Sequence, residues 1–242
     1  MKILTLWLWS FWFAINKLLA ENNPKNNFYF YWRNKDLVSS IKKTREHPNF
    51  FKWYKLPENI EVINNYDDII SDVDLLILAI PAQNIWFVIE QIVDKLKPGI
   101  KILNLAKWID IKNNQTIFWL LNNIFLSKDF DYAILSWWML AIDVVKSQNI
   151  WADLWVSNLK LWNEIKSLLS NKNFDIKISQ NILNIELYWC LKNIMAIIIW
   201  YYEELWEWKS SIWKYFVDYL NECKQIISIY WWTHELDFCY YS

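Results

Sequence analysis

The sequence predicts an α/β protein: a Rossmann-type doubly wound, mostly parallel sheet followed by an all-helical second domain. Up to about residue 180, short apolar runs alternate with longer amphipathic segments, a pattern typical of βαβ units. The run 75–80 is continuously apolar and ends at Pro81, as expected for a central strand covered on both faces. From residue 183 onward, helix-period segments contain no proline. We therefore expect a dinucleotide-binding domain at 1–180 and the start of a helical substrate or catalytic domain at 181–242.

The individual elements follow from the same patterning. Apolar runs bounded by polar or turn residues predict strands at 2–6, 28–31, 61–63, 75–80, 100–105 and 132–135. Amphipathic segments predict helices from the first strand to about residue 20, near 84–96 and at about 116–126, and a βα-like stretch continues to residue 178. Two long helices are expected at 183–205 and 210–229.

The composition excludes several classes of protein. The chain has 242 residues, a net charge of −1 and 55% hydrophobic residues. The near-zero charge argues against a nucleic-acid partner, which would require a basic excess or stripe, and the apolar content argues against disorder. No apolar run reaches the ~18 residues that span a bilayer. The 3 cysteines, Cys190, Cys223 and Cys239, are too few and too scattered for a disulfide framework.

The balance of tryptophan and glycine is unlike that of ordinary proteins. The chain has 20 tryptophans and 1 glycine, whereas glycine ordinarily makes up about 7% of residues and supplies the positions that need a positive φ. We therefore hypothesise that most tryptophans stand where the natural protein has glycine. A gene that reads UGA as glycine gives this pattern when it is translated with a table that reads UGA as tryptophan.

The spacing of the first tryptophans supports this hypothesis. Trp7, Trp9 and Trp12 directly follow the first strand and open a helix. With glycine at these positions, the segment has the G-x-G-x-x-G spacing of a dinucleotide-binding turn in its required context. The glycines allow the tight turn, the approach of the pyrophosphate and the packing of the helix on the strand, and the helix N-terminus attracts the phosphates. Taken literally, residues 2–20 resemble a signal peptide instead, but they lack a clear small-residue cleavage site.

Arg33 bears on the choice of cofactor. It follows the second strand, where NAD-binding sites usually carry an acidic residue for the ribose hydroxyls. A guanidinium at this position can pair with the 2′-phosphate of NADP. The alternative is an ordinary solvated surface charge.

Several motifs together resemble bacterial NAD(P)-dependent glycerol-3-phosphate dehydrogenases over nearly the whole chain. With tryptophan read as glycine, 7–14 resembles the family's G-x-G-S-W-G-x-A, with Phe11 where the family usually has tryptophan. Segments 47–60, 79–83, 106–109 and 135–137 resemble its L-P-x-N-I loop, A-V-P-S-Q strand end, K-G-I turn and L-S-G strand end. Segment 186–193 resembles its E-L-x-G-x-L-K-N helix, and Trp200, Trp206 and Trp208 fall on family glycines.

Lys192 is the candidate catalytic residue. Reduction of a ketone by hydride transfer requires a proton donor beside the carbonyl oxygen. Lys192 lies in an apolar helical segment, where desolvation would lower the pKa of its ammonium group. The resemblance implies the same proton-transfer role, although a lysine that extends from a core helix to solvent is the ordinary alternative.

The resemblance also implies the binding residues. For the cofactor it implies contacts at Trp7, Trp9, Ser10, Phe11, Trp12, Arg33, Phe50, Lys107 and Ala141. For the substrate it implies contacts at Lys107, Trp137, Met139, Lys192 and Asn193. For Phe50, the alternative to a cofactor contact is an aromatic side chain that only packs in the core. Lys107 follows a strand at the carboxyl edge of the sheet, where ligands bind in open α/β folds.

Two departures from the family pattern affect these expectations. The family's L-S-G-P-S-F-A is Leu-Ser-Trp-Trp-Met-Leu-Ala at 135–141, so the proline is replaced and Met139 lacks the hydroxyl that the family's serine offers to substrate. The chain ends before the family's G-D and S-R-N segments, so we expect a truncated fragment, and Asp237 is given no substrate-binding role.

Taken together, these features predict an enzyme that binds NADP or NAD and interconverts dihydroxyacetone phosphate and sn-glycerol 3-phosphate for phospholipid synthesis. We expect it in the cytoplasm, without a metal because His47 and His234 have no ligand pattern around them, and without nucleic acid or a membrane span. A homodimer is left open. The alternatives are another two-domain hydroxyacid or ketone-phosphate dehydrogenase or, if every tryptophan is real, a secreted or membrane-associated aromatic-rich binding protein.

Overall fold

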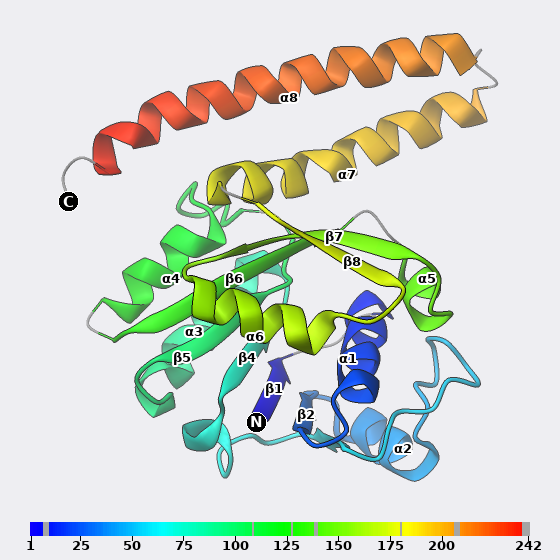
Figure 1. Ribbon diagram of the computed structural model, residues 1–242, viewed down its shortest axis with the longest axis vertical. Coiled ribbons are helices and arrows are strands. Elements are labelled where there is room, and N and C mark those ends of the chain that lie inside the picture. Colours follow the sequence, from blue (N-terminus) through cyan, green and yellow to red (C-terminus); the bar gives the residue numbers. More distant parts are fainter. Residues whose placement is uncertain are drawn as a thin grey trace.

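A computed structural model shows an eight-stranded sheet with a helical hairpin beside it (Figure 1). The structure describes residues 1–6, 10–107, 109–126, 128–137, 140–179, 181–205 and 209–238. The strands are β1 (Lys2–Leu6), β2 (Asn27–Tyr31), β3 (Ile60–Ile63), β4 (Leu75–Leu78), β5 (Ile100–Asn104), β6 (Phe130–Trp137), β7 (Ile150–Val156) and β8 (Phe174–Ile178).

The sheet has the strand order β3-β2-β1-β4-β5-β6-β7-β8. The first six strands are parallel, β7 runs antiparallel to β6, and β8 is parallel to β7. In the register of the central strands, Leu4 of β1 pairs with Tyr29 of β2 and with Leu76 of β4. The predicted doubly wound, mostly parallel sheet is therefore confirmed, with one antiparallel step between β6 and β7.

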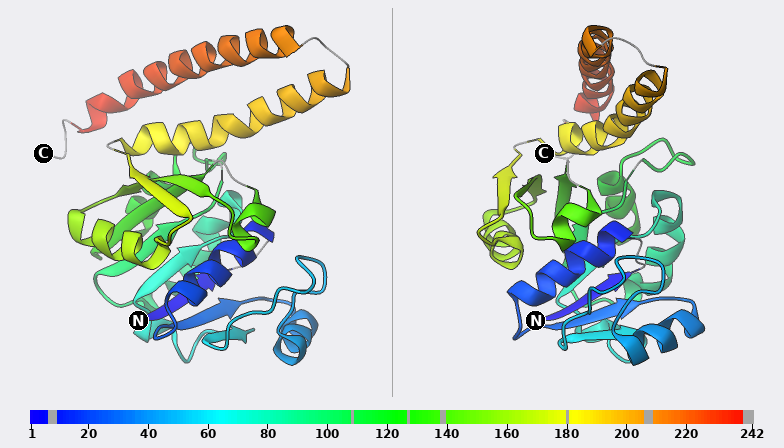
Figure 2. Two further views of the ribbon diagram at one scale, coloured as in Figure 1. Left: turned by 45° about the vertical axis from the view of Figure 1, so that its right-hand side comes forward. Right: turned by 90° about the vertical axis from the view of Figure 1, so that its right-hand side faces the viewer.

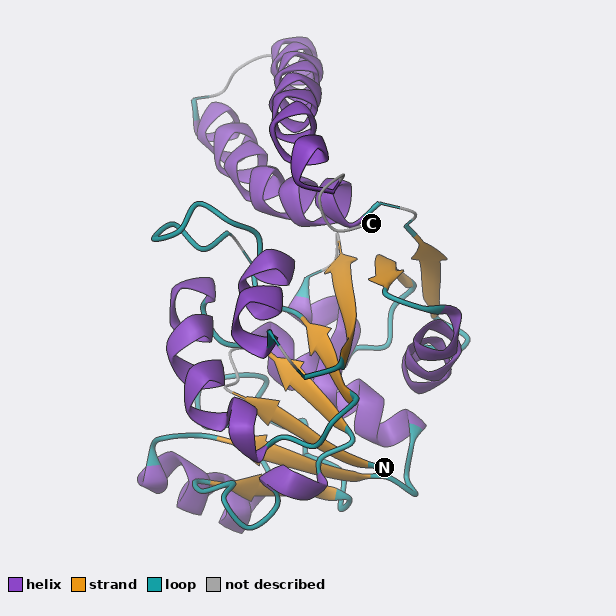
Figure 3. Ribbon diagram, turned by 90° about the vertical axis from the view of Figure 1, so that its left-hand side faces the viewer, coloured by secondary structure: helices purple, strands orange, loops and turns teal. Residues whose placement is uncertain are grey.

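Helices cover both faces of the sheet (Figure 3). One buried cluster joins the sheet to α1 (Ser10–Asn22), α2 (Lys35–Thr44), α5 (Ala141–Val145) and α6 (Leu159–Leu169). The other joins it to α3 (Ile85–Ile92), α4 (Ile117–Phe125) and the first turns of α7 (Ile182–Glu204). Because alternate residues of β4 enter the two clusters, the whole strand is apolar.

The C-terminal helices α7 and α8 (Lys209–Phe238) form an antiparallel hairpin beyond the edge of the sheet (Figure 2). Ile182, Leu183 and Ile185, at the start of α7, belong to the buried cluster of the sheet. Among the helices that the structure describes, none combines the length and the hydropathy of a membrane span. The expected domain boundary near residue 180 remains a prediction.

The observed elements differ from the expected ones in a few places. The expected strand 75–80 ends at Leu78, and the expected helix 84–96 is α3 flanked by short 3-10 turns, Ala82–Asn84 and Val93–Lys95. The sequence analysis did not identify α2, which has a mixed polar surface and begins where the Asn34 side chain accepts the N–H of Leu37. The last helix extends well past the expected end at residue 229.

Candidate functional site

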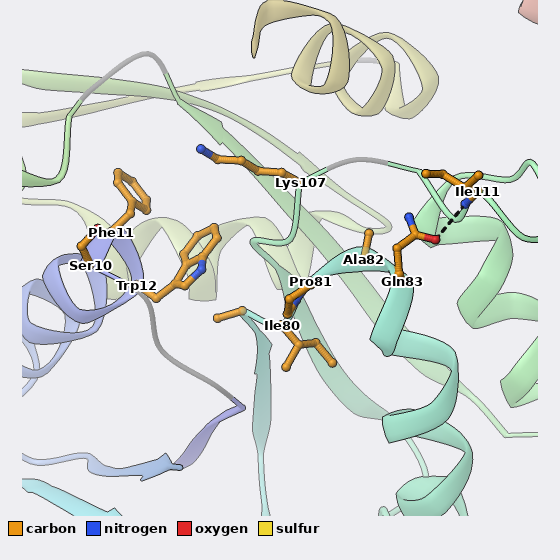
Figure 4. Close-up of a pocket in the computed structure, with 10 residues that line it drawn as sticks. Ser10, Phe11, Trp12, Ile80, Pro81, Ala82, Gln83, Lys107 and Ile111 are labelled. Carbon is orange, nitrogen blue, oxygen red and sulfur yellow. Dashed lines mark hydrogen bonds between the residues drawn. The ribbon is translucent and has the colours of Figure 1, made fainter. Parts of the chain in front are cut away.

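A crevice lies at the carboxyl ends of β1 and β4, the two strands between which the sheet changes its winding direction. The helix after β1 covers one face of the sheet and the helix after β4 covers the other. Open α/β sheets bind ligands at such a switch point. The crevice holds a cavity of about 560 Å³ (Figure 4), lined by Ser10, Phe11, Trp12, Ala79, Ile80, Pro81, Ala82, Gln83, Lys107 and Ile111.

The N-terminus of α1 forms one wall of this cavity. Ser10 is the first residue of the helix, and Phe11 and Trp12 follow it with their rings in an edge-to-face contact at 5.2 Å. The helix is fixed to β1 by the Asn16 side chain, which accepts from the Thr5 hydroxyl at 2.6 Å and donates to the Trp12 carbonyl at 2.8 Å. Backbone N–H groups at a helix N-terminus attract anions. Trp7 and Trp9 lie outside the described residues.

A second cavity of about 600 Å³ adjoins the first, since Ile80 lines both. It lies at the ends of β1 and β2, and Arg33 lines it with an exposed side chain. Tyr31, Tyr66 and Phe87 are its aromatic lining residues, and the two tyrosine rings make an edge-to-face contact with centroids 4.7 Å apart. Arg33 and the N-terminus of α1 therefore line two neighbouring cavities.

Phe50 lies in the loop after α2, and His47 holds it there. The two rings are stacked with centroids 4.3 Å apart, and the His47 Nδ1 atom accepts the backbone N–H groups of Asn49 and Phe50, each at 3.2 Å. Burial lowers the pKa of His47 to about 4, so the imidazole is neutral near pH 7. Phe50 is not among the residues lining either of the two cavities, and its expected cofactor contact remains a prediction.

Lys107 follows β5 and lines the first cavity. Figure 4 shows its side chain reaching toward the side of the cavity where Phe11 and Trp12 lie. The loop that carries it is tied to the segment after β4, because the Gln83 amide donates to the Ile109 carbonyl at 2.8 Å and accepts the Ile111 N–H at 3.2 Å. Burial lowers the pKa of the Lys107 ammonium group.

Lys192 projects from α7 with a half-buried side chain. Burial, together with the smaller effect of the Lys107 charge, lowers the pKa of its ammonium group to about 6. The sheet and the helical hairpin therefore bring together two lysines that are far apart in the sequence. Asn193, the next residue of α7, is also half-buried.

The remaining expected residues lie at the end of β6 and just after it. Trp137 is the last residue of β6, but its side chain and the whole of Met139 lie outside what the structure describes. Ala141 is the first residue of α5 and packs against the buried cluster that includes α1. The expected contacts of these three residues with cofactor or substrate therefore remain predictions.

The sequence analysis placed Gln83 and Glu186 in family motifs without giving them a role, and it did not single out Asn104 or Tyr132. Gln83 supports the Lys107 loop, and the buried residues Asn104, Tyr132 and Glu186 form a hydrogen-bonded chain behind it. A carboxylate inside the apolar stretch at the start of α7 was a signal that could have drawn attention to Glu186. Among the described residues, no group of three or more His, Cys, Asp or Glu side chains is placed to hold a metal ion.

Comparison with known proteins identifies the family. Residues 9–151 match the model of the NAD-dependent glycerol-3-phosphate dehydrogenase N-terminus. A glycerol-3-phosphate dehydrogenase [NAD(P)+] of Ehrlichia chaffeensis is 30% identical over 200 residues, which cover 81% of this chain and 60% of the relative. One of Clostridium botulinum is 24% identical over 190 residues, which cover 78% of this chain and 56% of the relative. The chain thus spans about half the length of such relatives.

Solved structures show the same fold. The crystal structure of glycerol-3-phosphate dehydrogenase from Coxiella burnetii superposes with a TM-score of 0.87 at 16% identity, covering 95% of this chain and 69% of that one. The Plasmodium falciparum glycerol-3-phosphate dehydrogenase superposes with a TM-score of 0.81 at 22% identity, covering 92% and 64%. The family match covers more than half of the chain, and we conclude that this chain belongs to the NAD-dependent glycerol-3-phosphate dehydrogenase family, of which it contains the N-terminal domain.

Proposed function

We propose that the protein, with glycine at the fingerprint positions, binds NADP(H) or NAD(H) in the crevice and interconverts dihydroxyacetone phosphate and sn-glycerol 3-phosphate. The observation that carries this proposal is the convergence of three groups at one edge of the sheet. The N-terminus of α1 and Lys107 line the same cavity, and Lys192 lies close enough to Lys107 for the Lys107 charge to lower its pKa. Phosphate and a reacting carbonyl require these types of group.

The described residues fit a dinucleotide. The two cavities adjoin at Ile80 and extend from the N-terminus of α1 to Arg33. The helix N-terminus would hold the pyrophosphate, and Arg33 would meet a 2′-phosphate, which favours NADP. When bound, the reduced nicotinamide supplies the hydride for the carbonyl carbon. Trp12 does not fit a dinucleotide site, because its indole forms part of the cavity wall at a position where the fingerprint requires glycine.

Lys192 has the properties needed for proton transfer. In the free site its pKa of about 6 leaves the amine largely neutral at pH 7, and a neutral amine can accept the proton of an alcohol. A bound phosphate dianion would raise the pKa of both lysines by its charge. Lys192 would then be an ammonium group able to give its proton to the carbonyl oxygen as the hydride reaches the carbon, and it would end neutral again.

The backbone at one tryptophan supports the recoding hypothesis independently of the fingerprint. Trp53 has φ +82° and an exposed side chain. Glycine adopts this left-handed conformation without the steric cost that a β-carbon brings. An indole that is exposed and makes no core contact gives no compensation for that cost. Glycine at position 53 would remove it.

Titration calorimetry with NADPH tests the binding proposal. We expect no measurable binding by the chain with all its tryptophans, because indoles at 7, 9 and 12 would occupy the turn and the space that the pyrophosphate needs. Binding should appear in the triple variant Trp7→Gly, Trp9→Gly, Trp12→Gly. A matched triple variant at exposed tryptophans elsewhere, Trp151→Gly, Trp200→Gly, Trp213→Gly, should not bind. Tight binding by the unchanged chain would contradict the assignment of the turn.

Substrate choice needs a separate measurement. In the full-length, glycine-restored protein, we expect NADPH oxidation with dihydroxyacetone phosphate and little with 2-oxo acids that lack a phosphate. Lys192→Met should lower kcat for this reaction by ~100-fold or more, in the range expected for loss of a proton-transfer group. Preference for a 2-oxo acid would instead support another two-domain dehydrogenase of this fold.

A further inference from the structure

A buried polar chain links the loop before Lys107 to the helix that carries Lys192. Its members are Asn104 at the end of β5, Tyr132 in β6 and Glu186 near the start of α7. All three are almost completely buried, at 0%, 1% and 4% exposure. They lie within or beside the apolar cluster that packs α4 and α7 against the sheet, where unpaired polar groups are costly.

The hydrogen bonds of this chain all point in one direction. The Ala106 N–H donates to Asn104 Oδ1 at 2.8 Å, and Asn104 Nδ2 donates to the Tyr132 hydroxyl at 2.8 Å. The Tyr132 hydroxyl in turn donates to Glu186 Oε1 at 3.0 Å, and the Phe118 N–H donates to the same oxygen at 3.1 Å. Three hydrogen bonds in series thus run from Ala106 to Glu186, and the Phe118 N–H is a second donor to the same Glu186 oxygen.

This arrangement is expensive for a purely structural contact. Burial raises the pKa of Glu186 to about 7 and raises that of the Tyr132 hydroxyl well above its usual value. Glu186 Oε2 is buried without a hydrogen-bond partner among the described residues. Apolar side chains of similar volume commonly replace buried charged groups without loss of stability. A role other than stability would account for this cost, and the ends of the network indicate what that role is.

One end of the hydrogen-bonded chain adjoins Lys107 in the sequence, and the other end lies on the helix that carries Lys192. Ala106 immediately precedes Lys107, and Glu186 precedes Lys192 by six residues on α7, a rise of about 9 Å along the helix. A displacement of α7 relative to β5 would change the separation of the two ammonium groups. The hydrogen-bonded chain would oppose such a displacement, because it connects β5 to α7 through almost completely buried groups.

We propose that Asn104, Tyr132 and Glu186 are positioning residues that set the spacing between Lys107 and Lys192. This inference rests on the proposed function, in which both lysines face the substrate. The network acts through the lysines and does not itself touch the reacting atoms. Substitution of its members should therefore change the electrostatic interaction between Lys107 and Lys192. A purely structural role would leave that interaction unchanged.

The test measures that interaction without cofactor or substrate. The pKa of Lys192 is followed by NMR of 13C-methylated lysines in the full chain, in Lys107→Met, in Tyr132→Phe and in the double variant. In the parent, Lys107→Met should raise the Lys192 pKa, because a neighbouring positive charge is removed. In the Tyr132→Phe background, which loses one hydroxyl and keeps the ring, the same substitution should raise it by no more than half as much.

Two further variants make the result decisive. Tyr66→Phe removes a hydroxyl at the second cavity and should leave the effect of Lys107→Met unchanged. Asn104→Ala breaks the chain at its other end, provides the same measurement if Tyr132→Phe does not fold, and should also weaken the effect. Equal effects of Lys107→Met in the parent and in a folded network variant would overturn the proposal.

The conservative variant separates position from charge. Glu186→Gln keeps an oxygen that accepts from Tyr132 and Phe118, so it should preserve the effect of Lys107→Met, whereas Glu186→Ala should weaken it. Loss of the effect in both would show that charge rather than position matters, and would overturn the proposal. Because none of these measurements involves turnover, failure of the dehydrogenase proposal would appear separately, as absent NADPH binding or absent reduction of dihydroxyacetone phosphate.

Discussion

The sheet region, up to Ile178, and the α7–α8 hairpin cover their apolar side chains in different ways. Every residue of β4 is at most 1% exposed, because helices pack on both faces of the sheet. In the hairpin, Ile197, Trp200 and Val217 are 64%, 63% and 53% exposed. Of the described hairpin residues, those in the buried cluster of the sheet lie in the first turns of α7. Burial of apolar surface is the main stabilising term in folding, so the two regions should respond differently to the same substitution.

The largest effect is expected for a paired truncation. Ile77→Ala removes side-chain atoms that are completely buried in β4, whereas Ile197→Ala removes the same atoms from an exposed position of α7. We expect Ile77→Ala to lower the free energy of unfolding by about 2–5 kcal/mol. Ile197→Ala should change it by less than ~0.5 kcal/mol, as at other surface positions. Urea unfolding followed by circular dichroism measures both values.

The pair also tests the comparison itself. If Ile197→Ala destabilised the protein as much as Ile77→Ala, the exposed face of α7 would be covered in solution and the contrast between the regions would be lost. Measurements at several protein concentrations separate self-association from a monomeric effect, since only self-association makes the result concentration-dependent.

The second-largest expected effect is a loss of stability at acid pH that arises from His47 in the sheet region. His47 has a folded-state pKa of about 4, against about 6.5 when unfolded. Between these values the unfolded chain binds more protons, so the contribution of His47 to stability is fully present above pH 6.5 and is lost as the pH falls toward 4. The loss should amount to about 1–3 kcal/mol, because a charged imidazole is unfavourable at this buried position. Protonated Nδ1 also can no longer accept from Asn49 and Phe50.

His47→Asn is the control, since its side-chain oxygen can accept the same N–H groups and does not titrate. Glu186 acts in the opposite sense: its pKa is raised to about 7 in the folded protein, so its contribution grows as the pH falls. The difference between parent and His47→Asn cancels this opposing contribution. A difference in unfolding free energy that stays constant from pH 7 to pH 4 would show that His47 titrates normally.

Much of the fold was predictable because its signals are local. The apolar run 75–80 and the polar residues around it identified β4, and the spacing after β1 indicated the turn into α1. The antiparallel pairing of β7 with β6 was not predictable, because strand direction depends on which partner is available across the sheet. Lys107 and Lys192 could be named from local motifs, but their mutual proximity required the packing of α7 on β6.

The buried network could not be predicted for a related reason. Glu186 stands out in its apolar segment, but Asn104 and Tyr132 do not stand out in theirs, and the three residues become a unit only when three elements assemble. Their pKa shifts arise from burial, which a single sequence does not reveal. Sequence patterns thus predicted most elements and named candidate site residues, whereas the supporting interactions between elements came only from the structure.

A third effect concerns ligand selectivity at the edge of the sheet region. Arg33 is exposed and lines the second cavity. In the glycine-restored chain, Arg33→Asp should lower the ratio of NADPH to NADH affinity by about 10-fold or more, because a carboxylate repels the 2′-phosphate and accepts from ribose hydroxyls. Lys42→Asp, an exposed charge reversal at the far end of α2, should leave the ratio unchanged. An unchanged ratio in Arg33→Asp would remove Arg33 from the cofactor site.

The smallest effect compares one tryptophan from each region. Trp53 in the loop after α2 and Trp213 in α8 are 87% and 66% exposed, but Trp53 has φ +82° whereas Trp213 lies within a helix. Trp53→Gly removes a left-handed strain of ~1–2 kcal/mol and costs some conformational entropy, so we expect a net gain of ~0.5–1 kcal/mol in unfolding free energy. Trp213→Gly should lose a similar amount, because glycine is a poor helix former.

Opposite signs for these two variants would show that the loop backbone suits glycine and the helix backbone does not. Destabilisation by both would mean that the Trp53 indole contributes contacts that outweigh its strain, and would weaken the recoding hypothesis at this position. Peptide mass spectrometry of the protein from its natural source would identify directly which residue is present at position 53. A peptide spanning residue 53 that carries glycine would explain why this loop adopts a conformation that tryptophan disfavours.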